Sequence, residues 1–303
     1  MAFLCPGPCA RAWSHCPKII ALDGTNGTSA FKGVVLVATA MDGAGQIFPI
    51  ALGFAQSECN ESWRFFVRHL ADALDIHDAP LTVISDRCKG INNGVSEFLP
   101  RAAHAYCAFH IRQNALSYGK TAADFVWLLA NASTVHEYEE LTATLETKSE
   151  RAHAYLATIK REQWVRAFFP LPRYGHVTSN IAEATNAWLL ECRALRPMLF
   201  FHETIRKINT TFSQRREFYE MGDPNDIEED VLVKIVKNTD EGRKLKSTHF
   251  EGLIYCVETS ERERNTRVVY LEKKTCSCKL FQDLGFPCVH ACRAALMARI
   301  DIE

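Results

Sequence analysis

Three apolar segments joined by tight turns limit the folds that this chain can adopt. Ile19–Leu22, Phe31–Ala40 and Ile47–Phe54 have the length and composition of strands. The connections carry turn residues such as the Asp42-Gly43 pair, which is typical of a two-residue hairpin. Since short connections join antiparallel neighbours, residues 18–53 are predicted to form a three-stranded antiparallel meander.

Helices and short strands alternate after the meander. Glu61–Leu74 places its apolar residues at helical spacing and predicts an amphipathic helix against the sheet. Leu81–Ser85 and Ala103–Cys107 predict two further strands, and the segments Ile91–Phe98 and Phe109–Tyr118 predict helices. The order of three antiparallel strands, helix, strand, helix, strand, helix is that of a ribonuclease-H-like fold, an α/β fold with a mixed sheet.

The rest of the chain divides by composition. Thr121–Phe169 is rich in Ala, Leu and Glu, holds no strand candidate and predicts a helical insertion over about residues 119–177. An acidic stretch around Gly222-Asp223-Pro224-Asn225 predicts a linker. We therefore predict an N-terminal extension over residues 1–17, a core with its insertion over 18–218, a linker over 219–245 and a small C-terminal domain over 246–303.

Charge and hydropathy exclude some classes of function. The 303 residues include 35 Lys and Arg against 36 Asp and Glu, so nucleic-acid binding through a global basic field is excluded. No apolar run approaches the roughly 18 residues needed to cross a bilayer. Met1–Cys16 lacks the basic start of a secretory signal. We expect an intracellular protein with no membrane partner.

Three acidic residues accompany separate predicted elements. Asp23 closes the first strand, and Asp86 closes Leu81–Ser85. Glu183 lies inside the predicted helix Ser179–Leu190. Two divalent ions about 4 Å apart promote phosphoryl transfer, and such hard ions prefer carboxylate oxygens. Taken singly, an Asp after a strand is commonly a turn residue and a Glu in a helix is commonly solvated. Brought together, the three acids predict a site for Mg²⁺ or Mn²⁺.

Several short sequence words surround these acids. They are Ile20-Ala21-Leu22-Asp23-Gly24-Thr25, Phe31-Lys32-Gly33, Ala40-Met41-Asp42-Gly43, Gln46-Ile47-Phe48-Pro49-Ile50-Ala51, Glu58 with Glu61-Ser62-Trp63, Ile84-Ser85-Asp86-Arg87-Cys88-Lys89-Gly90, Cys107-Ala108-Phe109-His110 and Asn180-Ile181-Ala182-Glu183-Ala184-Thr185-Asn186. In these words and their order the chain resembles the Mutator-like (MULE) transposases, a DDE-type family with a ribonuclease-H-like core, over about Lys18–Arg196. By that resemblance Asp23, Asp86 and Glu183 correspond to the three catalytic acids, with a helical insertion before the third.

The resemblance implies metal-dependent DNA cleavage and strand transfer. Asp23 and Asp86 would hold both ions, and Glu183 would complete the cage. The implied partners are transposon ends and target DNA in the nucleus, and self-association as a homo-oligomer stays open. Two alternatives also remain: a domesticated, non-catalytic DNA- or protein-binding transcriptional regulator, and a degenerate relic with no present role.

A cysteine cluster lies near the C-terminus. Cys276-Ser277-Cys278 and Cys288-Val289-His290 offer three thiolates and one imidazole in two close pairs. A structural zinc takes four such ligands at about 2.0–2.3 Å in tetrahedral geometry. The pattern therefore predicts a zinc site, and it resembles the SWIM zinc finger, which commonly follows the transposase core in this family. Cys292 is a competing ligand whose predicted helical position favours a packed thiol.

Four other residues near the predicted sheet are candidates for a role beside the acids. Cys107 and His110 match a Cys-x-x-His element of the family and allow metal or DNA contact. Because two ligands do not make a tetrahedral zinc site, we favour a buried thiol and a hydrogen-bonded imidazole near the acids. Asp42 is explained by its hairpin turn, and Glu58 is at most a supporting group.

A locally basic stretch follows the third acid. Clustered cations bind phosphates, although a solvated helix face explains such a run equally well. Its members are Arg193, Arg196, Arg206, Lys207, Arg215 and Arg216. No base-reading element is predicted, since the N-terminal cysteines are too few to form the zinc-containing DNA reader of the family. Those cysteines are Cys5, Cys9 and Cys16.

Overall fold

A computed structural model describes residues 1–27, 32–220, 228–259 and 266–300 of the chain. The structure divides into two compact units, which we describe separately. The sheet unit comprises Met1–Val126 and His176–Pro224, and the finger unit comprises Trp127–Gly175 and Asn225–Glu303. Most of the predicted insertion therefore belongs to the same unit as the predicted C-terminal domain. Among the described helices, none combines the length and the apolar character needed to cross a membrane.

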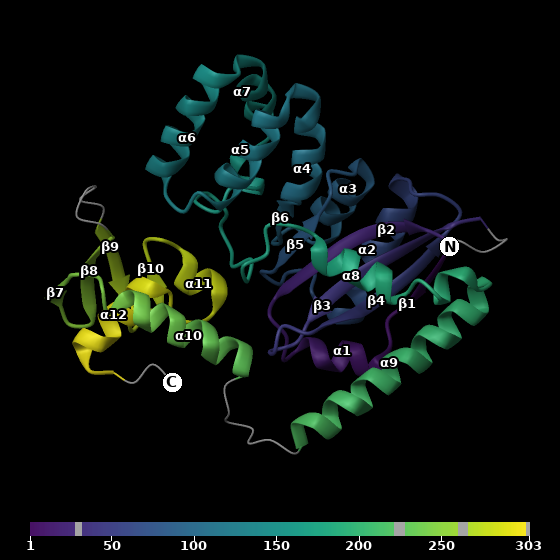
Figure 1. Cartoon of the computed structure of the whole chain (residues 1–303). Coiled ribbons are helices and arrows are strands. Elements are labelled where there is room, and N and C mark those ends of the chain that lie inside the picture. The colour runs from purple at the N-terminus through teal and green to yellow at the C-terminus, as the bar shows by residue number, and fades with distance from the viewer. Residues whose placement is uncertain (28–31, 221–227, 260–265, 301–303) are drawn as a thin grey trace. The chain divides into compact units, whose positions relative to one another are not determined.

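A six-stranded mixed sheet forms the centre of the sheet unit (Figure 1). Its strands are β1 (Ala2–Leu4), β2 (Ile19–Asn26), β3 (Val34–Met41), β4 (Ile47–Ala55), β5 (Thr82–Ser85) and β6 (Ala103–Tyr106). They lie in the order β1-β4-β3-β2-β5-β6. The pairs from β1 to β2 are antiparallel, whereas β5 runs parallel to β2 and β6 parallel to β5. The predicted mixed α/β class is confirmed.

Helices pack on both faces of this sheet. They are α1 (Gly7–Trp13), α2 (Asn60–Leu74), α3 (Lys89–Phe98), α4 (Ala108–Ala115), α8 (Asn180–Trp188) and α9 (Pro197–Glu220), with short 3-10 turns η1 (Leu116–Tyr118) and η3 (Cys192–Ala194). Leu36 of β3 packs in one buried cluster with Trp63 and Phe66 of α2. Val37, its neighbour, packs in another with Phe200 of α9. Successive strand residues point to opposite faces, so β3 is buried on both sides.

The predicted meander is confirmed, with a change at Asp23. Strands β2, β3 and β4 pair antiparallel as expected. However, β2 does not end at Leu22, because its pairing with β3 continues to Asn26. The parallel pairing of β2 with β5 stops earlier, at Ala21 and Ile84. Asp23 therefore lies inside a strand, just beyond the last residue paired with β5, and not in a turn after it.

The predicted extension and the predicted linker both contain regular secondary structure, and two predicted features lie outside the described residues. The extension over residues 1–17 contains β1 and α1, and Phe3 of β1 pairs with Gly53 of β4. Phe31, the predicted start of the second strand, lies outside the described residues. Within the predicted linker, helix α10 (Glu229–Gly242) is described, whereas Gly222–Asn225 lie outside the described residues.

The finger unit combines helices with a second sheet. Residues 119–177 contain the helices α5 (Lys120–Asn131), α6 (Val135–Lys148) and α7 (Glu150–Ala157) and the short 3-10 turn η2 (Arg161–Gln163). Helix α5 begins in the sheet unit and ends in the finger unit. The C-terminal part contains β7 (Ser247–Glu251), β8 (Ile254–Glu258), β9 (Thr266–Tyr270), β10 (Thr275–Cys276), α11 (Leu280–Leu284) and α12 (Val289–Ala298). Its sheet is antiparallel in the order β10-β9-β8-β7. The segments Gly252–Val257 and Thr266–Leu271, whose composition predicts a hairpin leading into the cysteine cluster, correspond to the antiparallel pair β8 and β9.

The insertion and the C-terminal part of the finger unit join around Asp283 of α11. Asp283 is buried, with 5% of its surface exposed. Its carboxylate accepts a hydrogen bond from the backbone N of Arg173 and lies 3.4 Å from Arg166 Nε. Lys279 donates from Nζ to the carbonyl of Ala167 at 2.6 Å. We call Asp283, Arg166, Arg173 and Lys279 the Asp283 junction. It attaches the end of the insertion to the short helix between the two predicted ligand pairs.

Candidate functional site

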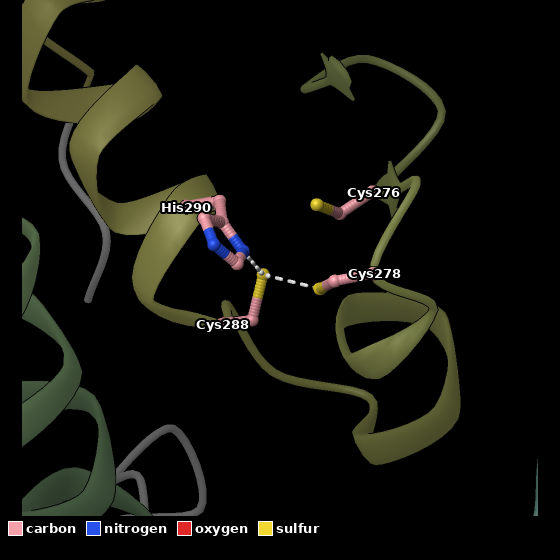
Figure 2. A group of neighbouring side chains, drawn as sticks. All are labelled: Cys276, Cys278, Cys288 and His290. Carbon is pink, nitrogen blue, oxygen red and sulfur yellow. Dashed lines mark hydrogen bonds between the residues drawn. The ribbon is translucent and has the colours of Figure 1, made fainter. Parts of the chain in front are cut away.

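The four predicted zinc ligands lie together in the finger unit. Ligand atoms of Cys276, Cys278, Cys288 and His290 all fall within 4.8 Å of one another. Cys278 Sγ is 3.6 Å from Cys288 Sγ, which is 3.8 Å from His290 Nδ1 (Figure 2). Ligands bound tetrahedrally to zinc at about 2.3 Å stand about 3.8 Å apart, so the spacing and the thiol and imidazole donors fit this ion.

Local structure holds each ligand pair. Cys276 ends β10, and the Gln282 side chain bonds its backbone N and O at 3.0 and 3.1 Å. Cys288 caps the start of α12, which places His290 in the first turn. Hydrogen bonds from Cys276 and Cys288 hold the pKa of Cys278 below its usual range, which favours the thiolate that binds zinc.

The predicted competitor Cys292 lies outside this ligand group. Its buried thiol donates to the carbonyl of Pro287, as expected of a packed cysteine on a helix. Among the described residues, this Cys₃His group is the one set of potential metal ligands whose ligand atoms all lie within 4.8 Å of one another. The structure therefore brings together all four residues that the spacing predicted.

Asp23 and Asp86 lie side by side in the sheet unit. The parallel pairing of β2 with β5 ends at Ala21 and Ile84, and Asp23 and Asp86 each follow two residues after that last pair. Neighbouring strands are about 4.8 Å apart, and residues at one level share a face. Burial, and then the charge of Asp86, raise the pKa of Asp23 to about 6. The fold thus brings these two carboxylates close enough for the charge of one to act on the other.

Hydrogen bonds orient both carboxylates. Asp23 Oδ1 accepts from the backbone N of Gly24 at 3.0 Å, and Oδ2 accepts from Asn186 Nδ2 at 2.6 Å. Asp86 Oδ1 accepts from the backbone N of Cys88 at 2.9 Å. The donors fix the direction of each carboxylate before any ligand arrives.

Glu183 lies on α8 and does not form a close ligand group with the other two acids. Its residue is exposed in the first turn of the helix. No hydrogen bond or ion pair found among the described residues joins it to Asp23 or Asp86, and the three do not form a close ligand group there. Asn186, one helical turn later, makes the contact with Asp23. The structure therefore brings Asp23 and Asp86 together and places Glu183 on helix α8, which is hydrogen-bonded to Asp23 through Asn186.

Glu58 lies closer to this pair than the sequence suggested. Its Oε1 accepts from Trp63 Nε1 at 3.0 Å, and its charge contributes to the raised pKa of Asp23. A Cβ added to Gly24 would stand 2.8 Å from Glu58 Oε1, so a larger residue at this strand position would displace the Glu58 carboxylate. Gly24 after an apolar strand is typical of a turn, but close approach of another side chain is a second common reason for a glycine in a strand.

Cys107 and His110 also belong to the surroundings of the acids. Cys107 is 1% exposed, and its Sγ accepts from the backbone N of Ser179 at 3.3 Å. Hydrogen bonding to the Cys107 thiol raises the pKa of His110 against the effect of burial, and the charges of Asp86 and Asp23 add to this rise. The imidazole therefore lies within electrostatic reach of both acids, in a different unit from the zinc ligands.

Two known family models match the chain, one in each unit. The model of the MULE transposase domain matches residues 19–114, and the model of the SWIM zinc finger matches residues 266–299. The chain carries a MULE transposase domain and a SWIM zinc finger. A search of curated proteins finds no match.

The two matches cover the sites unequally. The SWIM range contains all four zinc ligands, so the match and the Cys₃His geometry together support a structural zinc. The MULE transposase domain range contains Asp23, Asp86 and Cys107 but ends before Glu183. Together the matches support a transposase-derived protein and confirm the family resemblance.

The predicted basic stretch after the MULE transposase domain is largely engaged in internal contacts. Three cations donate within the sheet unit: Arg193 to the carbonyl of Asn26 at 2.8 Å, Lys207 to that of Trp188 at 2.6 Å and Arg215 to Asp42 at 3.2 Å. Arg206 pairs with Glu203 at 2.8 Å. Arg196 and Arg216 are exposed. Half of the run therefore has a structural role, and only part of it is available to phosphates.

Proposed function

We propose that this chain acts as a MULE-type transposase, cleaving a DNA strand with divalent metal and transferring the freed end to target DNA. The observation that carries the proposal is the paired carboxylate of Asp23, whose pKa is about 6 because it is buried beside Asp86. Two acids held together at the cost of mutual repulsion are typical of a cation site. Asp23, Asp86 and Glu183 are the proposed catalytic acids.

The sheet order supports a ribonuclease-H-like assignment for the sheet unit. Three antiparallel strands, β4, β3 and β2, continue into β5 and β6, which are parallel to β2. Asp23 lies on β2, and Asp86 follows the adjacent β5. This arrangement puts both acids near one edge of a mixed sheet, where ligand sites concentrate in α/β folds.

The donor set fits Mg²⁺ or Mn²⁺. Carboxylate oxygens are the ligands these hard ions prefer, and a cation would relieve the repulsion between Asp23 and Asp86. When bound, such ions activate an attacking oxygen and stabilise a leaving oxygen. Gly24 and Asn186 hold the Asp23 carboxylate in one orientation, and the Cys88 amide does the same for Asp86.

The proposed substrate is DNA, as transposon ends and target, so the proposed place of action is the nucleus. In this proposal the SWIM zinc finger contributes a zinc-stabilised scaffold that contacts DNA or protein. Its zinc is structural, because four protein ligands leave no open position for substrate.

A second candidate is a domesticated regulator that binds DNA or protein without cutting it. The observation that favours it is the exposed Glu183, which does not form a close ligand group with Asp23 and Asp86, whereas the amide of Asn186 donates to Asp23. An acid pair without a third ligand would bind metal weakly and cleave poorly.

Strand nicking by the purified, zinc-loaded chain separates the two candidates. With Mn²⁺ or Mg²⁺, supercoiled plasmid should be nicked by the wild type, and Asp86→Asn should reduce the rate at least about 100-fold because it removes a direct ligand. Asp72→Asn, an exposed acid paired with His77 in the same unit, is the matched control and should leave the rate unchanged.

Equal nicking by wild type and Asp86→Asn would contradict the assignment of the acids. DNA binding without metal-dependent cleavage by the wild type would instead favour the regulator. Neither binding nor cleavage would favour the relic.

A further inference from the structure

Three neighbouring strands bring Asp23, Asp86 and Cys107 into one row. The parallel register pairs Ser85 with Tyr106, so Cys107 follows at the level of Asp86. The backbone N of Cys107 donates to the carbonyl of Ser85 at 2.8 Å, which continues the ladder to this point. Extended by two residues beyond its last pair, Ala21 with Ile84, the β2–β5 register brings Asp23 to the same level, and the charge of Asp86 acts on Asp23. Residues at one level of adjacent strands share a face, so the three side chains form a row across the sheet.

Helix α8 is attached to both ends of this row. At one end Cys107 Sγ accepts from the backbone N of Ser179, the residue that caps α8, at 3.3 Å. At the other end Asn186 donates to Asp23 at 2.6 Å. The helix also packs on β2, which carries Asp23, and on β3 and β4, and Figure 1 shows it lying against these strands. Both anchors are therefore made by a helix that crosses the strands.

The lengths of the helix and the row agree. Ser179 and Asn186 are seven positions apart, which is about 10.5 Å at about 1.5 Å per helical residue. Two gaps between strands span about 9.6 Å at about 4.8 Å each. Glu183 lies four positions after Ser179 and three before Asn186, so all three share one face of the helix. Because the hydrogen bonds of Ser179 and Asn186 hold this face at both ends, Glu183 lies between the two anchors on the face that carries them.

We propose that Cys107 is a positioning residue of the acid site, whose thiol holds the start of α8 so that Glu183 faces the Asp23–Asp86 pair. This inference rests on the proposed function, in which Glu183 is the third acid. Cys107 is suited to the task because its own position is fixed: it ends the β6 ladder and caps α4.

The contacts around the thiol support this role. The amide after it, that of Ala108, donates to the carbonyl of Val177 at 2.9 Å, which adds a second tie to the segment entering α8. The first amides of a helix have no partner within the helix, so an acceptor at Ser179 satisfies a group that would otherwise be unpaired. Although burial raises the pKa of Cys107, hydrogen bonds from His110 and Ser179 outweigh it and hold that pKa below its usual value.

Amide hydrogen exchange tests the anchor without requiring activity. In the full zinc-loaded chain, Cys107→Ala removes the acceptor and should speed exchange at the Ser179 amide about fivefold or more. Cys107→Ser keeps an acceptor of similar direction and should restore most of the protection. Cys9→Ala is the matched control, since it removes another buried thiol of the same unit from α1. If Cys107→Ala does not fold, Ser179→Pro removes the same hydrogen bond from the donor side, with exchange read at residues 180–183.

Metal titration of nicking tests the consequence for the acids. If Glu183 loses its place, Cys107→Ala should raise the Mn²⁺ concentration for half-maximal nicking about tenfold while DNA affinity stays unchanged. Cys107→Ser should recover part of that shift, whereas a merely structural loss would lower the active fraction and leave the half-saturation point in place.

The positioning role of Cys107 and the proposed function are contradicted by different results. Unchanged exchange at Ser179 in Cys107→Ala, or unchanged Mn²⁺ half-saturation despite faster exchange, overturns the positioning role. A wild type that does not nick contradicts the proposed function instead, and the exchange result then decides alone whether Cys107 anchors α8.

Discussion

The zinc cluster and the acid pair are built in opposite ways. The four ligands of the SWIM zinc finger come from two segments within residues 276–290, and their atoms lie within 4.8 Å of one another. Asp23, Asp86 and Glu183 come from three elements spread over residues 23–183, and the fold pairs two of them directly. The first site is set by local chain geometry and its ion, whereas the second depends on strand register and on where one helix rests.

This difference predicts how each site responds to damage. Losing zinc should remove local structure, because three of the ligands, Cys276, Cys278 and Cys288, are themselves members of the buried core cluster of this region. Losing an acid should spare the fold and remove chemistry, because the sheet beneath is buried on both faces by α2 and α9. The predictions below test this contrast, beginning with the largest effect.

Removing a zinc ligand should unfold the C-terminal part of the finger unit. Structural zinc contributes on the order of 10 kcal/mol or more in small zinc domains. Cys276→Ser, or chelation of the wild type, should therefore abolish exchange protection in α11 and α12 while β2–β6 keep theirs. Cys256→Ser, a half-buried thiol outside the cluster, is the control. Full protection of α12 after chelation would show that the cluster does not hold this region.

Neutralising Asp283 should loosen the insertion while leaving the zinc ligands in place. Asp283→Asn keeps an acceptor for the Arg173 amide but leaves Arg166 and Arg173 without their countercharge. Breaking a buried pair in this way costs about 3–5 kcal/mol. Exchange in α6 and α7 should therefore rise in the mutant while bound zinc stays at one ion per chain.

The exposed pair of Asp240 with Arg243 supplies the control for that experiment. Asp240→Asn should change stability by less than about 0.5 kcal/mol, because the side chain is 59% exposed. If the two substitutions behave alike, the Asp283 junction does not hold the insertion on the finger.

Asp23→Asn should stabilise the sheet unit at neutral pH. The pKa of Asp23 is about 6, above its ordinary value of 3.8, so its contribution to stability is fully present below about pH 4 and is lost as pH rises through about 6. Asn does not ionise. Calorimetry without added Mg²⁺ or Mn²⁺ should give the variant a melting temperature about 2–4 °C higher at pH 7.5, with the difference vanishing near pH 4. A variant less stable than the wild type at pH 7.5 would argue against repulsion at Asp23.

The sequence was sufficient for the zinc ligands and for most of the sheet. Cys-x-Cys and Cys-x-His place donors through local geometry alone, and the alternation and turns of residues 18–53 predicted strands that the structure contains. It misplaced the end of β2, because Gly24 resembles a turn residue while its pairing with β3 continues to Asn26.

The contacts that complete the acid site could not be read from the sequence. Asn186 reaches Asp23 across 163 positions, and the Ser179 amide reaches Cys107 across 72. Such contacts depend on the register of three strands and on the path of α8, which no local pattern specifies. The same holds for the Asp283 junction, where residues 110 positions apart meet. Composition alone also could not show that Arg193, Lys207 and Arg215 are used internally.

Anomalous diffraction from crystals soaked in Mn²⁺ tests most directly whether the acids form a metal site. We predict a peak within about 2.0–2.6 Å of carboxylate oxygens of both Asp23 and Asp86, with Glu183 turned toward it. Soaked crystals with no manganese between these two carboxylates would contradict the proposal that this sheet edge performs metal-dependent DNA chemistry.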